Sequence, residues 1–444
     1  MAKLIINGDV SKLKKLLNDK GQSYDKIIYS YKGKCFVEVR ELIDTLLKEQ
    51  NYALLKDFNE CLFWVENNTT MLPPRTHYPM YMQIEHTSYC NARCIMCFHY
   101  YHRNQLASNM DERVYSKCLA WLPFVRTVGL HGFGEPFLAP NLQSYLDDYH
   151  RYGVKIHTNT NLSLIPPYLH EYYSDFQFIN ISCDGATKEV FEGIRQNMSF
   201  DVFTNNVKLL RREAPEVQLN FAVVLMRQNL NQCSQIVHLA ANLGINRVMF
   251  SKIGINYVVS NYEDSVDRYP ETLRKNLRDA YEAGQKAGIE VIIPCRIEEL
   301  YESTDDKKLE EEQKIMSKIG FWEYSEKKLL SRIQNSGHTN IQLEREITEE
   351  CFSLTGRKVE GICDWLSNDI YISASGRVGF CCSNFKYYIG DLLEQELEDV
   401  WRGDNYRRMI EVFQSGELPH FCRNCNLLKK RMLSGVEEII RDGE

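Results

Sequence analysis

Short apolar segments alternate with amphipathic segments through the middle of the chain. From Met80 onward, mostly apolar runs are separated by stretches whose apolar residues recur every three or four positions, as they do in helices. This alternation is typical of a parallel sheet with right-handed crossovers. It predicts an α/β fold built around a partial (β/α)6 barrel of the TIM type, in which functional residues gather at the carboxyl ends of the strands. The expected strands are Met80–Glu85, Thr127–Gly132, Val154–Asn159, Phe178–Cys183, Gln218–Leu225, Arg247–Lys252 and Glu290–Pro294, and the expected helices include Glu189–Arg195, Phe203–Glu213 and Cys233–Leu243.

The segments on either side of this barrel have other patterns. Residues 1–75 predict a small α+β module with a helix at Leu13–Leu17, a hairpin over Lys26–Val39 and helices over Arg40–Asn67. Its end is marked by Pro73-Pro74. We therefore assign residues 76–296 to the barrel core. Residues 297–350 are rich in lysine and glutamate and predict a charged helical connector.

The final part, residues 351–444, predicts a cysteine-rich module. Ile370–Ser373 and Arg377–Cys381 have the pattern of a hairpin that turns at Ser375-Gly376. Leu397–Phe413 has the pattern of one amphipathic helix.

Charge and cysteine content narrow the classes of function. The chain has 444 residues and a formal net charge of −7 at pH 7, which argues against nucleic acid as a partner. No apolar run has the length of a signal peptide or a membrane span, so the sequence predicts a cytoplasmic protein with no membrane partner. Because cytosolic thiols stay reduced, 15 cysteines suggest metal binding or catalysis rather than disulfides.

Three of these cysteines follow the first expected barrel strand directly. Cys90, Cys94 and Cys97 have the spacing C-x3-C-x2-C. Three thiolates on one short loop can bind three irons of a [4Fe–4S] cluster and leave the fourth iron open to a small molecule. Structural zinc usually has four ligands in paired spacings, but His99 or His102 could supply the fourth, so zinc stays open as an alternative.

This loop, in this position, resembles the signature of the radical S-adenosylmethionine superfamily. The resemblance implies that the open iron binds the amino and carboxylate groups of S-adenosylmethionine. One electron from the cluster then cleaves the sulfonium to methionine and a 5′-deoxyadenosyl radical, which takes a hydrogen atom from the substrate. The family often has an aromatic residue before the third cysteine, whereas this chain has Met96.

The later strand ends carry residues that resemble the family's cofactor contacts. The glycines of the Gly132-to-Pro136 motif would let the backbone approach a ligand, and Glu135 would accept hydrogen bonds from the cofactor's ammonium group. Thr158 and Asn159 offer polar groups to the barrel mouth. Ser182 and Asp184 resemble ribose and carboxylate contacts, and Arg195 is expected on the following helix, where it could pair with the cofactor carboxylate. The residues proposed for the cofactor are Gly132, Gly134, Glu135, Pro136, Thr158, Asn159, Ser182, Asp184 and Arg195.

A second set of cysteines lies in the final module. Cys363, Cys381, Cys422 and Cys425 have the spacing C-x17-C-x40-C-x2-C, which suits either a fully ligated [4Fe–4S] cluster or a structural zinc. With Tyr388-Ile389-Gly390-Asp391-Leu392 and Leu397-Glu398-Asp399-Val400-Trp401, this stretch resembles the SPASM or shortened twitch domain. The cysteines suffice for one auxiliary cluster, as in enzymes similar to 2-deoxy-scyllo-inosamine dehydrogenase. Cys382 could replace Cys381 as a ligand or donate a hydrogen atom to a substrate radical, although strand alternation favours a passive role.

The resemblance defines a mechanism but leaves the substrate open. It implies S-adenosylmethionine and two [4Fe–4S] clusters as cofactors, and flavodoxin or ferredoxin as electron donor. The expected substrate is a small polar metabolite of the aminocyclitol or sugar type, or a peptide, and the expected reaction is oxidation, epimerisation or crosslinking. A maturase that recognises a ribosomally made peptide through residues 1–75 is one alternative, and a non-catalytic zinc-binding scaffold is another.

Overall fold

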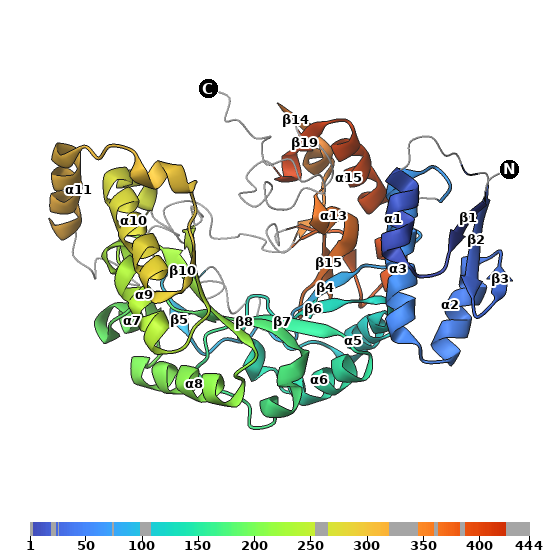
Figure 1. Ribbon diagram of the computed structural model, residues 1–444, viewed down its shortest axis with the longest axis horizontal. Helices are drawn as coiled ribbons and strands as arrows, with labels where there is room; N and C mark the ends of the chain where they lie inside the picture. The colour runs from blue at the N-terminus through green and yellow to red at the C-terminus, as the bar shows by residue number, and fades with distance from the viewer. Residues whose placement is uncertain are drawn as a thin grey trace.

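The dominant feature of the structure is a curved sheet of ten strands that forms the concave arc in the centre of Figure 1. The computed structural model describes residues 3–18, 24, 26–72, 75–97, 108–253, 265–318, 345–358, 363–381 and 387–422. The strand order is β12-β11-β10-β8-β7-β6-β4-β15-β16-β18. Every pair from β12 to β15 is parallel, as expected for a barrel built from strand–helix units.

The barrel elements agree closely with the sequence pattern. The strands are β4 (Tyr81–Ile84), β6 (Thr127–Gly129), β7 (Lys155–Thr160), β8 (Phe176–Ser182), β10 (Gln218–Leu225), β11 (Arg247–Lys252) and β12 (Glu290–Ile292). The helices are α5 (Glu112–Leu119), α6 (Leu142–Arg151), α7 (Lys188–Ile194), α8 (Phe200–Glu213), α9 (Cys233–Asn242) and α10 (Pro270–Ala287). In β8, Ile179 and Ile181 are fully buried, whereas Asn180 and Ser182 between them are only half-buried. Alternate residues therefore face the helix layer and the concave side.

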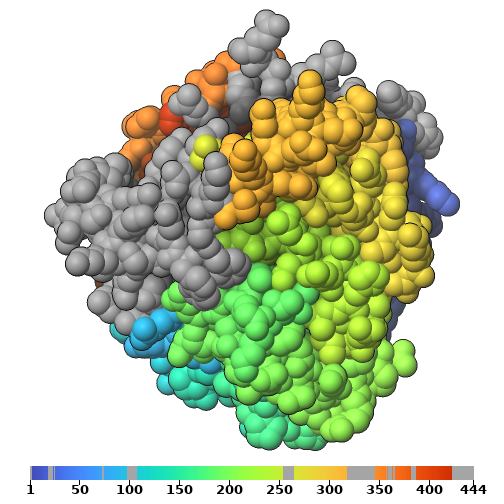
Figure 2. Space-filling view, turned by 90° about the vertical axis from the view of Figure 1, so that its left-hand side faces the viewer, coloured from blue at the N-terminus to red at the C-terminus, as the bar shows by residue number. Residues whose placement is uncertain are grey.

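The helices lie on the convex side of the sheet. Figure 2, which looks at the molecule from the left of Figure 1, shows the later helical units α7 to α11 covering that end of the arc. The expected charged connector contains α11 (Asp306–Lys318), whose Glu312 accepts hydrogen bonds from Thr272 of α10. None of the helices in the described part of the chain combines the length and the apolarity needed to cross a bilayer.

The C-terminal module extends the barrel sheet, an arrangement that the sequence pattern does not predict. The expected hairpin is present as β15 (Asp369–Ile372) and β16 (Arg377–Gly379), and β15 pairs parallel with β4. The other strands and α-helices of the module are β14 (Leu354–Lys358), α13 (Asp364–Asn368), β17 (Tyr387–Tyr388), β18 (Gly390–Asp391), α14 (Leu397–Trp401), α15 (Asp404–Gln414) and β19 (Glu417–Pro419). The end of the connector contributes β13 (Arg345–Glu346), which pairs with β17.

The single helix expected over Leu397–Phe413 is wrong, because the structure has two helices separated at Arg402 and Gly403. A Cβ atom at Gly403 would lie 2.6 Å from the carbonyl oxygen of Asp399. The break therefore depends on a close backbone contact, which the apolar periodicity does not reveal.

The N-terminal module has its own core and lies at the right of Figure 1. It contains β1 (Lys3–Ile6), α1 (Val10–Asn18), β2 (Lys26–Tyr31), β3 (Lys34–Phe36), α2 (Val39–Lys48) and α3 (Tyr52–Asn68). The expected hairpin is present: Tyr31 pairs with Lys34 across Lys32 and Gly33, both of which have positive φ. This is the two-residue turn that matches the twist of an antiparallel pair.

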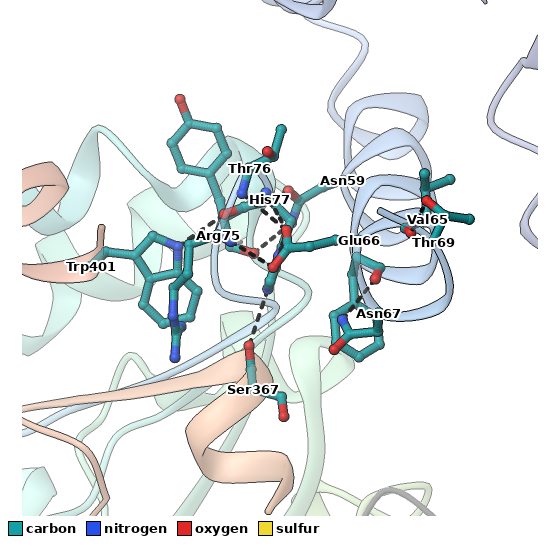
Figure 3. Close-up of polar contacts among 12 residues, drawn as sticks. Asn59, Val65, Glu66, Asn67, Thr69, Arg75, Thr76, His77, Ser367 and Trp401 are labelled. Atoms are coloured by element: carbon teal, nitrogen blue, oxygen red, sulfur yellow. Dashed lines mark hydrogen bonds and ion pairs between the residues drawn. The ribbon is translucent and has the colours of Figure 1, made fainter. Parts of the chain in front are cut away.

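Figure 3 shows how a short segment after this module joins all three parts of the molecule. His77 Nδ1 lies 2.8 Å from the Glu66 carboxylate of α3, and its Nε2 lies 3.1 Å from the Ser367 carbonyl of α13. The Trp401 indole donates to the His77 carbonyl at 2.9 Å. The chain entering β4 is therefore fixed to both flanking modules.

Candidate active site

The loop with the first three cysteines lies at the carboxyl end of β4. Cys94 belongs to a two-residue strand, β5 (Arg93–Cys94), which pairs antiparallel with β9 (Arg195–Gln196) and places Cys94 opposite Arg195. The Cys97 amide donates to the Cys94 carbonyl at 3.0 Å. Cys90, Cys94 and Cys97 thus share one short loop, whereas His99 and His102 lie outside the described residues.

The surroundings of the thiols suit sulfur atoms that carry negative charge. An Arg195 guanidinium nitrogen lies 3.6 Å from Cys94 Sγ, and the side-chain nitrogen (Nδ2) of Asn161 lies 3.8 Å from Cys90 Sγ. Burial raises the pKa of Cys90 to about 11 and that of Cys94 to about 12. A thiol in such a site loses its proton when a metal supplies positive charge. The donor set therefore fits an iron–sulfur cluster.

Within the described residues, no three His, Cys, Asp or Glu side chains converge on one point that could hold a single metal ion. A [4Fe–4S] cube has a different requirement, because each cysteine binds a different iron.

The Gly132-to-Pro136 loop lies directly against the cysteine loop. A Cβ atom at Gly134 would lie 2.2 Å from the Thr87 carbonyl oxygen, and one at Gly132 would lie 2.3 Å from a Glu85 carboxylate oxygen. These glycines therefore allow the loop to pack closely against the end of β4, whereas the sequence predicted a close approach to a ligand. Pro136 begins a short 3₁₀ helix, Pro136–Leu138.

Glu85, a buried residue at the end of β4, is a part of the site that the sequence pattern did not predict. One carboxylate oxygen accepts the amide hydrogens of Phe133 and Gly134, and the other accepts that of Ala374 at 3.1 Å. Glu85 thus links the glycine loop to the turn between β15 and β16. The sequence does contain an indication of this role, because Glu85 is an acidic residue directly after an apolar strand.

Glu135 is 3% exposed and is hydrogen-bonded within the protein. Its carboxylate accepts hydrogen bonds from the Thr160 hydroxyl at 2.5 Å and from the backbone amide of Asn161 at 2.7 Å. Its own amide donates to the Tyr89 carbonyl at 2.8 Å. Burial raises the pKa of the Glu135 carboxyl to about 7, although these hydrogen bonds act to lower it. The group therefore changes charge near neutral pH.

The end of β7 differs from the expectation. β7 continues to Thr160, so Thr158 is not at the strand end; it is fully buried, whereas Asn159 on the opposite face is exposed. Asn161 comes after the strand and contacts Cys90, a position that the sequence analysis missed because it ended the strand early.

Asp184 and Arg195 form a buried ion pair of 2.7 Å. Asp184 also accepts the Val224 amide hydrogen at 2.7 Å. Arg195 lies in β9, not on the preceding helix as expected, so its guanidinium lies between Asp184 and Cys94. Cys183 faces the core and is fully buried, as strand alternation predicts.

Polar and aromatic side chains line the concave face below these loops. Asn220 donates to Asn180 at 2.9 Å, and Asn180 donates to Asn159 at 2.8 Å, across three paired strands. Next to this asparagine row, the His157 ring stacks on Tyr81 at 5.4 Å and on Phe178 at 4.6 Å. The concave face therefore offers both amide groups and ring faces.

The second set of cysteines is partly described. Cys363 is buried directly before α13, and Cys381 and Cys422 are half-buried against the main core. The residues before the last two, Phe380 and Phe421, have ring centroids 5.3 Å apart, so the segments that carry Cys381 and Cys422 lie together. Cys425 and Cys382 lie outside the described residues.

Residues 363–426 match the family model described as the SPASM iron–sulfur cluster-binding domain. This domain follows a partial β/α barrel whose first strand leads into C-x3-C-x2-C. The SPASM domain match and the curated relatives support the SPASM/twitch branch of the radical S-adenosylmethionine enzymes. The SPASM domain match and the AdoMet-bound structure of similar fold support S-adenosylmethionine and [4Fe–4S] clusters as cofactors.

Two curated relatives match part of this chain. The mycofactocin maturase MftC of Mycobacterium tuberculosis is 27% identical over 172 residues, which cover 37% of this chain and 43% of the relative. The tungsten-containing aldehyde ferredoxin oxidoreductase cofactor-modifying protein of Pyrococcus furiosus is 22% identical over 209 residues, which cover 43% of this chain and 57% of the relative. The matches thus span about half of each relative's length.

Solved structures share the fold. Streptococcus suis SuiB bound to its precursor peptide SuiA superposes with a TM-score of 0.51 and 14% identity, over 90% of this chain and 77% of SuiB. The enzyme anSMEcpe with bound AdoMet gives a TM-score of 0.50 and 15% identity, over 79% of this chain and 84% of anSMEcpe.

Proposed function

We propose that this chain is a radical S-adenosylmethionine maturase that modifies a peptide. Cys90, Cys94 and Cys97 would hold the cluster that binds the cofactor, and the auxiliary cluster would be held by Cys363, Cys381, Cys422 and Cys425. When bound, these groups supply reductive cleavage of the sulfonium and a radical that removes hydrogen from the substrate. We propose flavodoxin or ferredoxin as the electron source.

The chain's own residues would hold the cofactor in two ways. Asn159 and Ser182, on the concave face, would contact it directly, and Glu135 would orient its ammonium group through the loop that it stabilises. Asp184 is fully buried and already paired, so we assign Asp184 and Arg195 to positioning Cys94 instead. Gly132, Gly134 and Pro136 would shape the loop, and buried Thr158 would support β7.

The observation that carries the peptide proposal is the extent of the fold shared with peptide-bound SuiB. The superposition covers 90% of this chain, more than residues 76–444 represent, so it extends into the N-terminal module. The relative MftC is also named a maturase.

The N-terminal sheet offers a surface for an extended peptide. Within the described residues, its order β1-β2-β3 leaves β1 and β3 as edges. Ile5 is 55% exposed on the face away from the core, and Val37, just after β3, is 60% exposed. An unpaired strand edge beside exposed apolar side chains can bind a peptide as an added strand.

The test uses the full-length, anaerobically reconstituted enzyme with dithionite as reductant. Synthetic peptides encoded by short reading frames beside the gene are compared with aminocyclitols. We expect one peptide to increase the formation of 5′-deoxyadenosine. Mass spectrometry of that peptide should show the loss of hydrogen or a new crosslink. The variant Cys35→Pro, which removes an edge amide of β3, should weaken only the peptide effect.

Two outcomes would contradict the proposal. Stimulation by an aminocyclitol but by none of the peptides would assign a small-molecule substrate. Colourless protein that holds zinc and no iron would make the chain a zinc-binding scaffold.

A further inference from the structure

Arg75 lies in the interior between the N-terminal and C-terminal modules and has no ion-pair partner among the described residues. Arg75 is 1% exposed, and its guanidinium is sandwiched between the rings of Trp401, at 3.8 Å, and Tyr406, at 3.9 Å. One nitrogen donates to the Leu366 carbonyl, whereas Nε and the other terminal nitrogen have no hydrogen-bond partner within the described part of the chain. Among the described residues, no carboxylate lies within ion-pair distance of it.

This arrangement is costly, so it calls for a compensating partner. A buried charge without a counter-charge is strongly unfavourable. The Arg75 backbone also has φ of 63°, which side chains other than glycine rarely adopt. Burial lowers the pKa of Arg75 to about 10, so the group still carries its charge at neutral pH. Glu66 and Asp369 act on it only from beyond ion-pair distance.

The contacts of Arg75 lead to the auxiliary cysteines on two sides. Its acceptor, Leu366, belongs to the turn whose Leu366 and Ser367 amides donate to the Cys363 carbonyl at 2.9 and 3.1 Å. On the other side, the Tyr406 ring packs 4.9 Å from Phe380, the residue before Cys381. Burial raises the pKa of the Tyr406 hydroxyl, the Arg75 charge lowers it, and the Cys381 thiol raises it.

A cluster at these cysteines would supply the missing negative charge. A [4Fe–4S] cube with four thiolates is anionic and gains a further negative charge on reduction, and net charge and hydrogen bonding set its reduction potential. A fixed positive charge in a dry interior favours the more negative state. We propose that Arg75 is the counter-charge of the auxiliary cluster and raises its reduction potential, a role that rests on the proposed ligands Cys363, Cys381, Cys422 and Cys425.

The segment after Arg75 holds the charge in place. Glu66 accepts the Arg75 amide at 2.6 Å, and the His77 carbonyl accepts the Trp401 indole, so backbone and stacking ring are both fixed (Figure 3). Proteins often tolerate the replacement of buried charged groups by neutral side chains of similar volume, because the replacement also removes the cost of desolvating the charge. Neutral variants at Arg75 are therefore reasonable experimental choices.

The test reads the auxiliary cluster alone. In a Cys90→Ala/Cys94→Ala/Cys97→Ala background, reconstituted protein is titrated anaerobically while the reduced cluster is followed by electron paramagnetic resonance. We expect Arg75→Gln and Arg75→Met to lower the ratio of reduced to oxidised cluster at a fixed potential at least tenfold, equivalent to about 59 mV for one electron. Arg75→Lys keeps the charge and should stay near the parent value.

Arg402→Gln is the matched control. Arg402 is ion-paired with Glu398 and its side chain is 30% exposed, so removing its charge should change the ratio by much less than tenfold. An unchanged potential in both neutral variants overturns the role of Arg75, and so does loss of iron from both while Arg75→Lys retains it, because Arg75 would then be structural. If the parent background holds no iron, the proposed auxiliary cluster itself fails.

Discussion

Two buried arginines, one beside each set of cysteines, are treated differently by the fold. Arg195 lies 3.6 Å from Cys94 Sγ and 2.7 Å from the Asp184 carboxylate. Arg75 lies near the segments of Cys363 and Cys381, stacked between two aromatic rings, with no carboxylate in ion-pair contact within the described residues. One guanidinium is neutralised by its neighbour and the other is not.

The difference teaches what each arginine can contribute. The Asp184–Arg195 pair adds almost no net charge near Cys94, so its effect is to fix β9 against the cysteine loop and to direct a donor at sulfur. Arg75 keeps its whole charge in the interior, where screening by water is weak. The first cysteine site is thus organised by geometry, and we infer that the second is tuned by charge.

The largest effect should come from removing the three proposed cluster ligands of the first cysteine site, because this should disable that site and leave the second one intact. We expect Cys90→Ala/Cys94→Ala/Cys97→Ala to abolish formation of 5′-deoxyadenosine and to reduce iron from about eight to about four per chain. The auxiliary iron should remain, because its proposed cysteines lie in a separate module. The measurements are product analysis after dithionite reduction and iron determination.

The control for this variant is Cys35→Ala, since Cys35 is exposed on β3. It should leave both readouts unchanged. Persistent 5′-deoxyadenosine in the triple variant would remove the assignment of Cys90, Cys94 and Cys97.

Removing the carboxylate partner of Arg195 would leave the first cysteine site with an uncompensated buried arginine, as at the second site. Asp184→Asn keeps an oxygen that can accept the Val224 amide but removes the negative charge. We expect local stability around β5 and β9 to fall by about 3–5 kcal/mol, because a buried charge is left uncompensated. Hydrogen exchange of the amides in β5 and β9 measures this loss.

The double variant Asp184→Asn/Arg195→Gln provides the matched comparison, because it removes both charges. Part of the lost protection should return. The single variant Arg195→Gln completes the cycle. If the loss of amide protection in the double variant equals the sum of the losses in Asp184→Asn and Arg195→Gln, the ion pair is not what holds β9 against the cysteine loop.

The sequence predicted the order of the barrel well, since β10 and β11 have the expected bounds and Cys183 faces the core. Apolar periodicity and alternation report burial, which is local information. They could not predict that β15 joins the sheet beside β4, because that pairing joins residues distant in the chain. For the same reason, the contacts of Glu85 and Asn161 and the stacking of Arg75 between Trp401 and Tyr406 depend on tertiary structure.

The two sites should also respond differently to pH. Burial raises the pKa of Glu135 to about 7, so this carboxyl is neutral in the folded protein at a pH where it ionises in the unfolded chain. Its contribution to stability is complete below about pH 4.5 and is lost as the pH rises through 7. Between these values, the difference in unfolding free energy between iron-free wild type and Glu135→Gln should fall by up to about 3 kcal/mol.

Denaturant unfolding at a series of pH values measures this difference. Arg75 stays charged throughout that range and glutamine does not titrate, so Arg75→Gln serves as the pH-independent comparison. A flat difference for Glu135→Gln would mean that the carboxyl is ionised in the fold, held by Thr160 and Asn161 as an anion.

The smallest expected effect separates packing from charge at the second site. Trp401→Phe keeps an aromatic ring against Arg75 but removes the indole donor to the His77 carbonyl. We expect a loss of about 1–2 kcal/mol in unfolding free energy, the usual cost of one buried hydrogen bond and a small change in volume. The auxiliary potential should stay near the wild-type value, because the guanidinium charge remains. A potential that shifts as far as in Arg75→Gln would show that ring packing, and not the charge, distinguishes the second site from the first.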